Sequence, residues 1–378
     1  MTAFQLWMVS QDPSAGWDYR VYSGAVLAFS NGQNPFVLEN VVQYVGGNLP
    51  FTYPPHTLYF FWVLNCIHIF DNIGMYYLLL SILLIASLSL ITRIDSQPDV
   101  FFLVTLVLTG FMAVVWNFGT GNKDIFFLFL FALMFFLLMK EKYWQSSIVM
   151  GLTGAISLIT GPFVALFLFV RQSWPRRILY ILLSGVVVGI LFLVGYLVNR
   201  GYFDSYIGTI QGGMSPLYDI GGYNTPTPYL LFGDLLKGLN ITGQVPLAVV
   251  SCIYIGVIAY AAWNYYSRHS SDLLQVYSVI TLAVFMLLPR IKPYDFIILA
   301  VPLYFLFRNR SIRMKCLMFA VISLPIFGWY LNFLIYPEDI PLYLGIYTQT
   351  YSLFLIFLVV MVTDYLKRSH RPAETTPS

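Results

Sequence analysis

One aspartate near the start of the chain lies in a setting that suits acid–base chemistry. Asp18 belongs to GWDYRVYSGAVLAFSNGQNPF, residues 16–36, the least hydrophobic long segment near the start of a very hydrophobic sequence. A carboxylate held against a membrane surface is partly desolvated, and this makes it a stronger general base. The alternative is an N-cap of a helix, an ordinary role for aspartate. The two roles are compatible, so Asp18 is a candidate catalytic residue.

A second group of candidates follows in FTYPPHTLYFF, residues 51–61. Its two prolines predict the start of a membrane helix, because proline is tolerated in a first helical turn. Tyr53 and His56 are then expected at the outer boundary between water and lipid. His56 is a candidate catalytic partner of Asp18, and the alternative is an ordinary polar residue at the interface.

The third candidate site is LLPRIKPYDF, residues 287–296, which is predicted to be a turn between two membrane segments. Arg290 and Lys292 suit a phosphate that is anchored to lipid and must be held from the side. Tyr294 and Asp295 add polar groups to the same turn. The alternative is that the two cations are anchors that lie along the lipid and extend their charges to water.

The composition of the chain indicates the class of protein to which these candidate residues belong. Apolar residues make up 58% of the chain and charged residues 10%, against a usual charged share of about 25%. So little polar surface cannot cover a soluble globule. The net charge of +3 gives no support for a nucleic-acid partner, since no basic aromatic stripe accompanies it. Cys66, Cys252 and Cys316 lie inside apolar runs without paired spacing, which predicts buried inert thiols.

Apolar runs from residue 56 to residue 366 predict an all-α polytopic membrane protein with a single domain over residues 1–368. Most runs are close to the ~20 residues that cross a bilayer. The segment at 145–170 carries the Gly161-Pro162 break and is predicted to form two half-helices. The predicted spans are 56–70, 72–92, 99–118, 124–139, 145–170, 178–198, 246–266, 273–289, 294–307, 314–335 and 342–366.

The segment 18–30 is predicted to be a helix that stops at Ser30, Asn31 and Gly32. Asp18, Tyr22, Ala25 and Phe29 share one of its faces. At about 13 residues it is too short to cross a bilayer, so it is expected to lie along the interface, where its tyrosines suit the headgroup level.

The distribution of basic residues predicts the orientation, because short cytoplasmic loops are rich in lysine and arginine. The predicted cytoplasmic set is Arg171, Arg176, Arg177, Arg268, Arg308, Arg310, Arg313, Lys315, Lys367, Arg368 and Arg371. The predicted outer set holds single or acid-balanced charges: Arg20, Arg93, Lys140-Glu141-Lys142, Arg200, Arg290 and Lys292. The outer face would then hold residues 11–55, 200–244, 289–294 and 336–341, and the disordered tail 369–378 would be cytoplasmic.

The outer loop 200–244 is long and rich in glycine, tyrosine and proline, which is typical of a functional lid. The chain has no GK[ST], GxGxxG or HExxH motif, so nothing indicates a nucleotide or a zinc hydrolase. Asp95 and Asp99 would flank an outer loop at 93–98 and could join Asp18 around a cation. Their spacing matches no compact metal site, so no metal site is assigned and a divalent metal stays open.

An outward aspartate on a juxtamembrane helix, a YPP start of the next helix and later cations resemble the polyprenol-phosphate-sugar-dependent glycosyltransferases of the GT-C superfamily. The pattern is most similar to the GT87-like family of mycobacterial mannosyltransferases that extend phosphatidylinositol mannosides. That family shows an Asp, a Tyr, "G-x-N-P-[YF]" and "[FY]-x-Y-P-P". Here it reads Asp18, Tyr22, Gly32-Gln33-Asn34-Pro35-Phe36 and Phe51-Thr52-Tyr53-Pro54-Pro55.

Weaker matches follow at Gly119-Thr120-Gly121-Asn122, Lys140/Lys142, Gly151-Leu152-Thr153-Gly154 and Thr160-Gly161-Pro162, where the family's lysine before the proline is lost. Such enzymes begin with a membrane helix before the aspartate, so FQLWMV, residues 4–9, reads as the end of one. The resemblance therefore implies a GT-C-type bundle of about 11 spans, or 12 in a complete chain. Relatives often carry a histidine where this chain has Tyr294 and Asp295. In this chain, His56 is therefore the histidine that could pair with the catalytic aspartate.

The resemblance implies transfer of a hexose, expected to be mannose, from a polyprenyl phosphate to a hydroxyl of a lipid or glycan acceptor. Asp18 would be the base, and Tyr22, Tyr53, Arg290, Lys292, Tyr294 and Asp295 would bind substrate. The reaction would need no dissociable cofactor, would invert the anomeric carbon, and would take place on the outer face of a prokaryotic plasma membrane. The rival classes are a lipid-phosphate transporter or flippase and a noncatalytic scaffold subunit, although a transporter predicts ionisable residues near the midplane and commonly a repeat.

Overall fold

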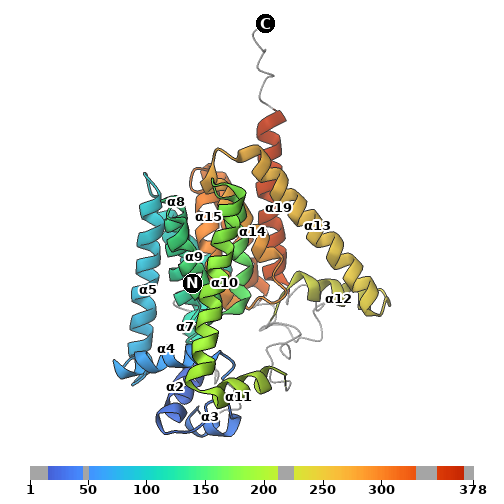
Figure 1. Ribbon diagram of the computed structural model, residues 1–378. Helices are drawn as coiled ribbons and strands as arrows, with labels where there is room; N and C mark the ends of the chain where they lie inside the picture. The colour runs from blue at the N-terminus through green and yellow to red at the C-terminus, as the bar shows by residue number, and fades with distance from the viewer. Residues whose placement is uncertain (1–15, 46–50, 212–224, 329–346, 370–378) are drawn as a thin grey trace.

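The structure is a computed structural model that describes residues 16–45, 51–211, 225–328 and 347–369. The described residues form helices and no strand (Figure 1). Five helical stretches are long and apolar enough to cross a membrane: Ile73–Ile94, Val100–Thr120, Trp174–Val198, Gln244–His269 and Thr348–Leu366. The chain is therefore a helical membrane protein, whereas the expected count of 11 or 12 spans remains a prediction.

The long stretches can be followed in Figure 1, where all of them except α6 carry a label. They are α5 (Ile73–Ile94), α6 (Val100–Thr109) with α7 (Ala113–Thr120), α10 (Trp174–Val198), α13 (Gln244–His269) and α19 (Thr348–Ser369). The shorter apolar helices are α8 (Asp124–Met139), η2 (Leu158–Phe169), α14 (Leu273–Met286) and the continuous pair η5 (Pro293–Leu299) and α15 (Ala300–Phe307).

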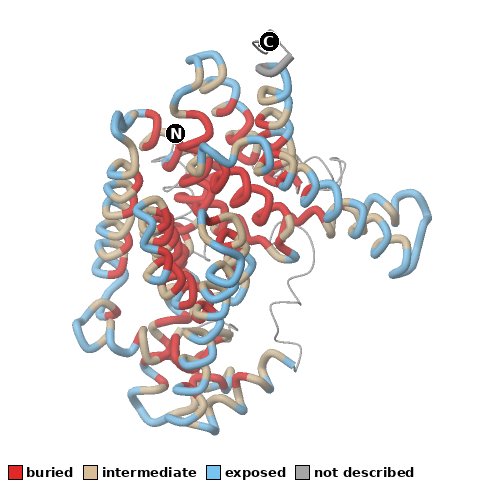
Figure 2. The backbone as a smooth tube through the Cα atoms, turned by 45° about the horizontal axis from the view of Figure 1, so that its top comes forward, coloured by how far each residue is buried: buried red, intermediate tan, exposed pale blue. Residues whose placement is uncertain are grey.

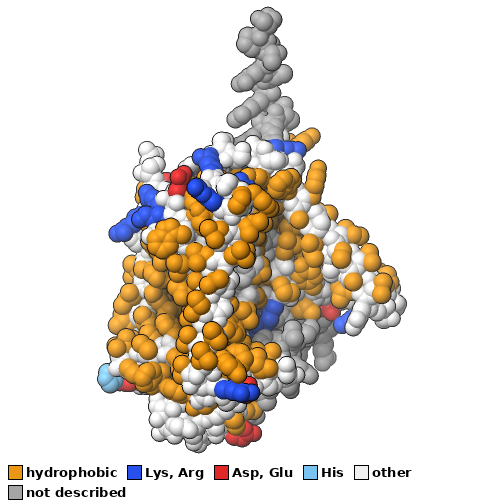
Figure 3. All heavy atoms as spheres, viewed as in Figure 1, with side chains coloured by type: hydrophobic (Ala, Val, Ile, Leu, Met, Phe, Trp, Pro, Cys, Tyr) orange, Lys and Arg blue, Asp and Glu red, His pale blue; other side chains and the backbone are white. Residues whose placement is uncertain are grey.

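Burial divides these helices into an inner and an outer group. Every residue of α14 from Val276 to Met286 is buried, and so is every residue of α15, which makes this hairpin the centre of the core (red in Figure 2). By contrast, α10 and α13 bury few residues and present apolar side chains outward over most of their length (Figure 3). Outward apolar side chains of this kind suit contact with lipid.

A layer of short helices covers one end of the bundle, at the bottom of Figure 1. It contains α2 (Trp17–Ser30), α3 (Leu38–Val45), α4 (Pro55–Cys66) and α11 (Arg200–Gln211). We call this the site end. The helix α2 agrees with the short interfacial helix predicted from the sequence, and its Tyr22 and Ala25 are fully buried.

The helix α4 corrects one predicted span. It begins at Pro55, as the proline pair predicted. It ends at Cys66, however, and its 12 residues extend only about 18 Å, so it cannot cross a hydrocarbon layer of about 30 Å. It lies across the bundle at the site end (Figure 1). The span predicted at 56–70 is therefore wrong, and α5 is the first crossing helix among the described residues.

Residues 143–170 form two half-helices, as predicted, but they separate at Ser157, and Gly161-Pro162 lies inside the second half. The helix α9 (Tyr143–Ile156) runs toward the site end, where the Ala155 carbonyl contacts His56 at 2.8 Å. The helix η2 then returns, and its Leu168 carbonyl accepts a hydrogen bond from Arg177. The hairpin therefore starts and finishes at the end of the bundle opposite the site end.

We call this opposite end the basic end, because Lys and Arg side chains gather there (top of Figure 3). Two ion pairs fix which loops belong to it: Arg308 Nη1 lies 2.5 Å from Asp95 Oδ2, and Lys315 Nζ lies 2.6 Å from Asp99 Oδ2. The prediction that the loop 93–98 shares a face with Asp18 is therefore wrong. So is the placement of Arg93 and Lys140-Glu141-Lys142, which lie at the basic end after α5 and α8.

The two topological errors cancel further along the chain. One predicted crossing is lost at α4, and a second is lost because residues 143–170 return to their starting end. Residues 171–177 consequently stay at the predicted end, together with Arg268 and Arg308, while the turn at 287–293 stays at the other. Residues 4–9 and the acidic segment 336–341 lie outside the described residues.

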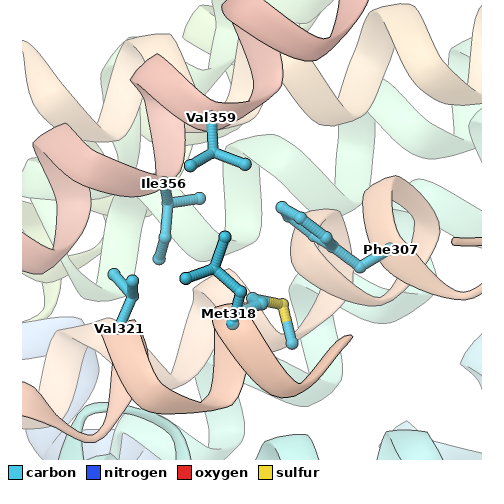
Figure 4. A pocket seen from close by; sticks show the side chains of 6 residues that line it. Phe307, Met318, Val321, Ile356 and Val359 are labelled. Atoms are coloured by element: carbon cyan, nitrogen blue, oxygen red, sulfur yellow. The ribbon is translucent and has the colours of Figure 1, made fainter. Parts of the chain in front are cut away.

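The basic end also holds an apolar hollow between α15, α19 and α16 (Ile312–Ile322) (Figure 4). Its lining residues are Phe307, Leu317, Met318, Val321, Ile356 and Val359. None of these side chains can donate or accept a proton, so acid–base chemistry has to be sought elsewhere.

Candidate active site

Asp18 lies in the first turn of α2, one residue inside the helix. The N-cap is Gly16, whose φ of 68° is readily adopted only by glycine. The Gly16 amide donates a hydrogen bond of 2.8 Å to the Gly119 carbonyl, which fixes the start of α2 against the end of α7. The capping interpretation of Asp18 is therefore wrong, and its carboxylate is available for other contacts.

The Asp18 carboxylate instead meets the loop that joins α7 to α8. The Asn122 side-chain amide donates a hydrogen bond of 2.9 Å to Asp18 Oδ2. Burial raises the pKa of Asp18 above its usual value, and this outweighs the lowering by Asn122, Thr120 and Lys123. A carboxylate with a raised pKa binds a proton more readily, which is what a general base requires.

A glycine makes the close approach of this loop possible. Gly121 has a φ of 70°, and a Cβ atom there would lie 2.7 Å from the Cβ atom of Tyr19 on α2. Both the backbone conformation and the contact exclude larger residues. The loop 119–122 therefore packs directly on the first turn of α2, which carries Asp18.

Tyrosines form the wall next to Asp18. The hydroxyl groups of Tyr22 and Tyr53 are 3.3 Å apart, and the Tyr22 ring also stacks on Phe61 with a centroid distance of 4.7 Å. Burial raises the pKa of both Tyr22 and Tyr53, and the nearby Asp18 carboxylate adds to the rise. Both hydroxyl groups therefore stay protonated and can donate hydrogen bonds to a bound sugar or phosphate.

Lys123 and Asp124 form a buried ion pair beside Tyr53. The Lys123 ammonium lies 3.2 Å from Asp124 Oδ1 and 4.4 Å from the centre of the Tyr53 ring. Burial by itself lowers the pKa of Lys123, but Tyr53, Asp124 and Asp295 outweigh it and hold that pKa above its usual range. The lysine is therefore positively charged at neutral pH.

The turn before η5 reaches the same cluster from the other side. The Asn117 side-chain amide donates a hydrogen bond of 3.0 Å to the Tyr294 carbonyl. The Asp295 Oδ2 atom accepts a hydrogen bond of 2.5 Å from the Lys292 amide. The Asp295 carboxyl group also lies near Asp124. The start of η5 therefore packs on α7 near the loop that carries Asn122, and the roles of Tyr294 and Asp295 in binding substrate stay predictions.

His56 is not part of this cluster of described contacts. Its Nε2 atom lies 2.8 Å from the Ala155 carbonyl, and its ring packs on Phe192 with a centroid distance of 4.9 Å. Burial lowers the pKa of His56, so the ring is neutral and donates from Nε2. These contacts join α4 to α9 and α10, which is a structural role rather than the predicted partnership with Asp18.

Sequence reasoning missed the side chains that hold the site together. Asn117, Lys123 and Asp124 were not selected as site residues, and Asn122 was noted only as the end of a weak motif. A signal was nevertheless present, because Lys123-Asp124 places two adjacent charges at the start of the apolar run 125–139. Charges at such a position are rarely accidental.

The described residues contain no group of three or more His, Cys, Asp or Glu side chains arranged to hold a metal ion. Asp95 and Asp99, which the sequence left open as partners of Asp18 around a cation, do not join it, because both pair with cations at the basic end.

These observations define a helical membrane protein with a shielded carboxylate site at one end of its bundle. The model of Glycosyltransferase family 87 matches residues 51–289. The chain belongs to that family and is a glycosyltransferase. A comparison with curated proteins finds no match. The matched range includes Tyr53 and residues 117–124, whereas Asp18 lies 33 residues before its start and Asp295 lies 6 residues after its end.

Proposed function

We propose that this glycosyltransferase moves a hexose from a polyprenyl monophosphate to a hydroxyl group of a lipid or glycan acceptor. The observation that supports this best is the Asp18 carboxylate, which is partly buried and oriented by Asn122 at the site end. A base in that setting suits activation of a weak hydroxyl nucleophile. Mannose is the expected sugar, because the motifs at Asp18, Gly32–Phe36 and Phe51–Pro55 resemble those of mannosyltransferases.

In the proposed reaction the acceptor oxygen attacks the anomeric carbon, and its proton passes to Asp18. The bond between the anomeric carbon and the phosphate oxygen breaks at the same time, and the phosphate leaves with the bonding electrons. A single displacement of this kind inverts the anomeric centre. Asn122 occupies Asp18 Oδ2, so Oδ1 is the oxygen proposed to take the proton.

Arg290 and Lys292 are proposed to bind the leaving phosphate. They belong to the turn between α14 and η5, and the Tyr294 carbonyl that follows in η5 accepts a hydrogen bond from Asn117 of α7. Cations near a departing phosphate stabilise the charge that develops in the transition state. Tyr22, Tyr53 and Tyr294 are proposed to line the sugar, since tyrosine offers both an apolar ring and a hydroxyl donor.

The depth of the site suits a donor held in lipid. The helix α8 has 16 residues and extends about 24 Å, which is less than the ~30 Å hydrocarbon thickness. Asp124, at its start, is therefore expected to lie below the membrane surface, beneath the layer of α2 and α4. A polyprenyl chain can remain in the bilayer while its phosphate reaches this level.

The distribution of charge supports an outward-facing site. The loops at the basic end carry most of the lysine and arginine residues, which favours the cytoplasm for that end. The site end then faces outward, as proposed for a prokaryotic plasma membrane. The proposed lid begins with α11 and ends with α12 (Pro228–Gly238), and the residues between 211 and 225 lie outside the described structure.

A donor assay tests the proposed function. The purified protein in vesicles is given a polyprenyl phosphate carrying a radiolabelled hexose, together with membrane-lipid acceptors. Transfer predicts a new labelled glycolipid and release of polyprenyl phosphate in equal amounts. Movement of the intact donor across the bilayer without a new product would indicate a transporter, and neither result with any hexose donor would indicate a scaffold. The last two outcomes would overturn the proposal.

A further inference from the structure

A tyrosine at the start of α5 carries a buried hydroxyl group without a partner. Tyr76 has no exposed surface, and its hydroxyl oxygen forms no hydrogen bond with the described residues. Burying a polar group without a hydrogen bond costs free energy. Such groups are rare in native proteins, and they commonly mark a place where a water molecule or a ligand binds.

The start of α5 holds the Tyr76 ring in a fixed position against α2. The helix is capped by Asn72, whose side-chain oxygen accepts a hydrogen bond of 3.0 Å from the Met75 amide. The loop before it is tied to α2, because the Tyr19 hydroxyl donates a hydrogen bond of 3.0 Å to the Phe70 carbonyl. The Tyr76 ring stacks on the Phe70 ring with a centroid distance of 5.4 Å. Tyr76 therefore has little freedom to turn its hydroxyl group elsewhere.

The same ring packs on the part of α2 that carries Asp18. Its centroid lies 5.5 Å from that of Tyr19 and 6.4 Å from that of Tyr22. Tyr19 is the residue after Asp18, and Tyr22 follows Asp18 by four positions, so Asp18 and Tyr22 share a face of the helix. Among the charged groups, the Asp18 carboxylate has the strongest electrostatic interaction with the Tyr76 phenol. This agrees with a hydroxyl group directed toward the site.

The neighbouring phenols are already paired. The hydroxyl groups of Tyr22 and Tyr53 lie 3.3 Å apart, and the Tyr19 hydroxyl donates to a backbone carbonyl. Of these four tyrosines, Tyr76 is the one whose hydroxyl group lacks a partner among the described residues. It is therefore the phenol beside Asp18 that is best able to accommodate a ligand oxygen.

We propose that Tyr76 binds the transferred hexose, with its hydroxyl group donating a hydrogen bond to a hydroxyl oxygen of the sugar. Tyr22 and Tyr53 are proposed to line the same sugar, and Tyr76 extends this wall because its ring packs on Tyr22. The bound sugar would satisfy the buried donor, so the contact adds to the affinity for the donor substrate. The inference deepens the proposed function and rests on it for the identity of the ligand.

Tyr76→Phe tests the contact, because it removes the hydroxyl group and keeps the ring. The KM for polyprenyl phosphate mannose should rise about 3–10-fold, with kcat and the KM for the acceptor almost unchanged. The unfolding midpoint without substrate should be unchanged or higher, since a buried hydroxyl group without a partner disappears. An unchanged KM for the donor would overturn the inference, and so would a rise confined to the KM for the acceptor.

Tyr277→Phe is the matched control. Tyr277 is also fully buried, and its hydroxyl group has no partner among the described residues. It lies near the start of α14, toward the basic end. The control should show the same small change in the unfolding midpoint as Tyr76→Phe and transfer hexose with an unaltered KM. An equal rise of KM in both variants would show that the effect is not specific to the site.

Binding of the donor measures the same contact without transfer. Polyprenyl phosphate mannose should raise the unfolding midpoint of the unaltered protein and of Tyr277→Phe, and should raise that of Tyr76→Phe less. Polyprenyl phosphate without a sugar should raise all three midpoints equally. This pattern in a protein that transfers no hexose would overturn the proposed reaction and leave Tyr76 as a sugar-binding residue. Equal shifts with the mannosylated donor, or no shift in the unaltered protein, would overturn the role of Tyr76.

Discussion

The side-chain amide of Asn122 donates a hydrogen bond of 2.9 Å to the carboxylate of Asp18, across 104 positions of the sequence. This bond connects the juxtamembrane helix α2 to the loop between α7 and α8. The preceding helix α7 contacts η5, because the Asn117 side-chain amide donates a hydrogen bond to the Tyr294 carbonyl. Three distant parts of the chain therefore meet at the site end, and the contacts around Asp18 can be tested separately.

Asp18→Asn is expected to lower the rate of hexose transfer by about 10²–10⁴-fold, because asparagine cannot take up the acceptor proton. The amide oxygen can still accept from Asn122, so the unfolding midpoint should be unchanged or higher. Turnover of labelled donor by the reconstituted variant measures the effect. Asp204→Asn, an exposed aspartate at the same end, is the control and should transfer normally. Full activity in Asp18→Asn would rule out its role as base.

Asn122→Ala is expected to move the acidic limb of the pH–rate profile upward. The hydrogen bond from Asn122 lowers the pKa of Asp18, so its loss raises that pKa further above the ordinary aspartate value. The base must be ionised to accept a proton, and the variant therefore needs a higher pH to reach its full rate. The profile of kcat/KM against pH measures this shift. Asn31→Ala, an exposed asparagine at the far end of α2, should leave the limb in place, and an unshifted limb in Asn122→Ala would contradict the prediction.

Gly121→Ala is expected to impair transfer through the position of α2. The added methyl group would meet Tyr19 at 2.7 Å in a backbone conformation with φ of 70°, a strain of about 1–2 kcal/mol before any clash. The first turn of α2 must then move away from Asn122. Gly208→Ala on α11 is the matched change, because open space surrounds that glycine. Equal activity of the two variants would show that the close approach is unimportant.

His56→Phe is expected to destabilise the protein by about 1–3 kcal/mol without altering the pH–rate profile, because it leaves a buried carbonyl without its donor. The bond between His56 Nε2 and the Ala155 carbonyl joins α4 to α9. Thermal unfolding measures the first effect and kcat/KM against pH the second. If one limb of the pH–rate profile disappears while the unfolding midpoint stays unchanged, His56 is a catalytic acid or base.

Cysteine labelling tests the corrected topology. After replacement of the native cysteines, a membrane-impermeant maleimide added to intact cells should label Gly208→Cys at the site end. Gln97→Cys, in the loop next to the Asp95–Arg308 pair, should react only after the membrane is permeabilised. Labelling of Gln97→Cys in intact cells would restore the topology first expected from the sequence.

The sequence points to candidate site residues at one end of the bundle, but it does not predict the path of the chain correctly. Asp18, Tyr22, Tyr53 and Tyr294 could be selected because their types are unusual beside a membrane. The helix α4 was misjudged because its residues are apolar enough for a span and only its length, 12 residues, prevents one. Hydropathy measures preference for lipid and carries no information on direction.

The interior of the site could not be predicted for a different reason. Lys123 and Asp124 are unusual charges at the start of an apolar run, but the sequence does not show which residues they contact. The Lys123 ammonium lies 4.4 Å from the centre of the Tyr53 ring, 70 positions earlier in the chain, and the sequence carries no sign of this contact. The role of Asn122 likewise depends on α2, which is remote in sequence.

The hairpin of α9 and η2 bears on how the chain is inserted into the membrane. Because residues 143–170 return to the end from which they start, they add no net passage through the bilayer. The helix α10 therefore enters the membrane in the same orientation whether this block is long, short or deleted. A change in the length of the hairpin can therefore alter the support under α4 without inverting any helix that follows.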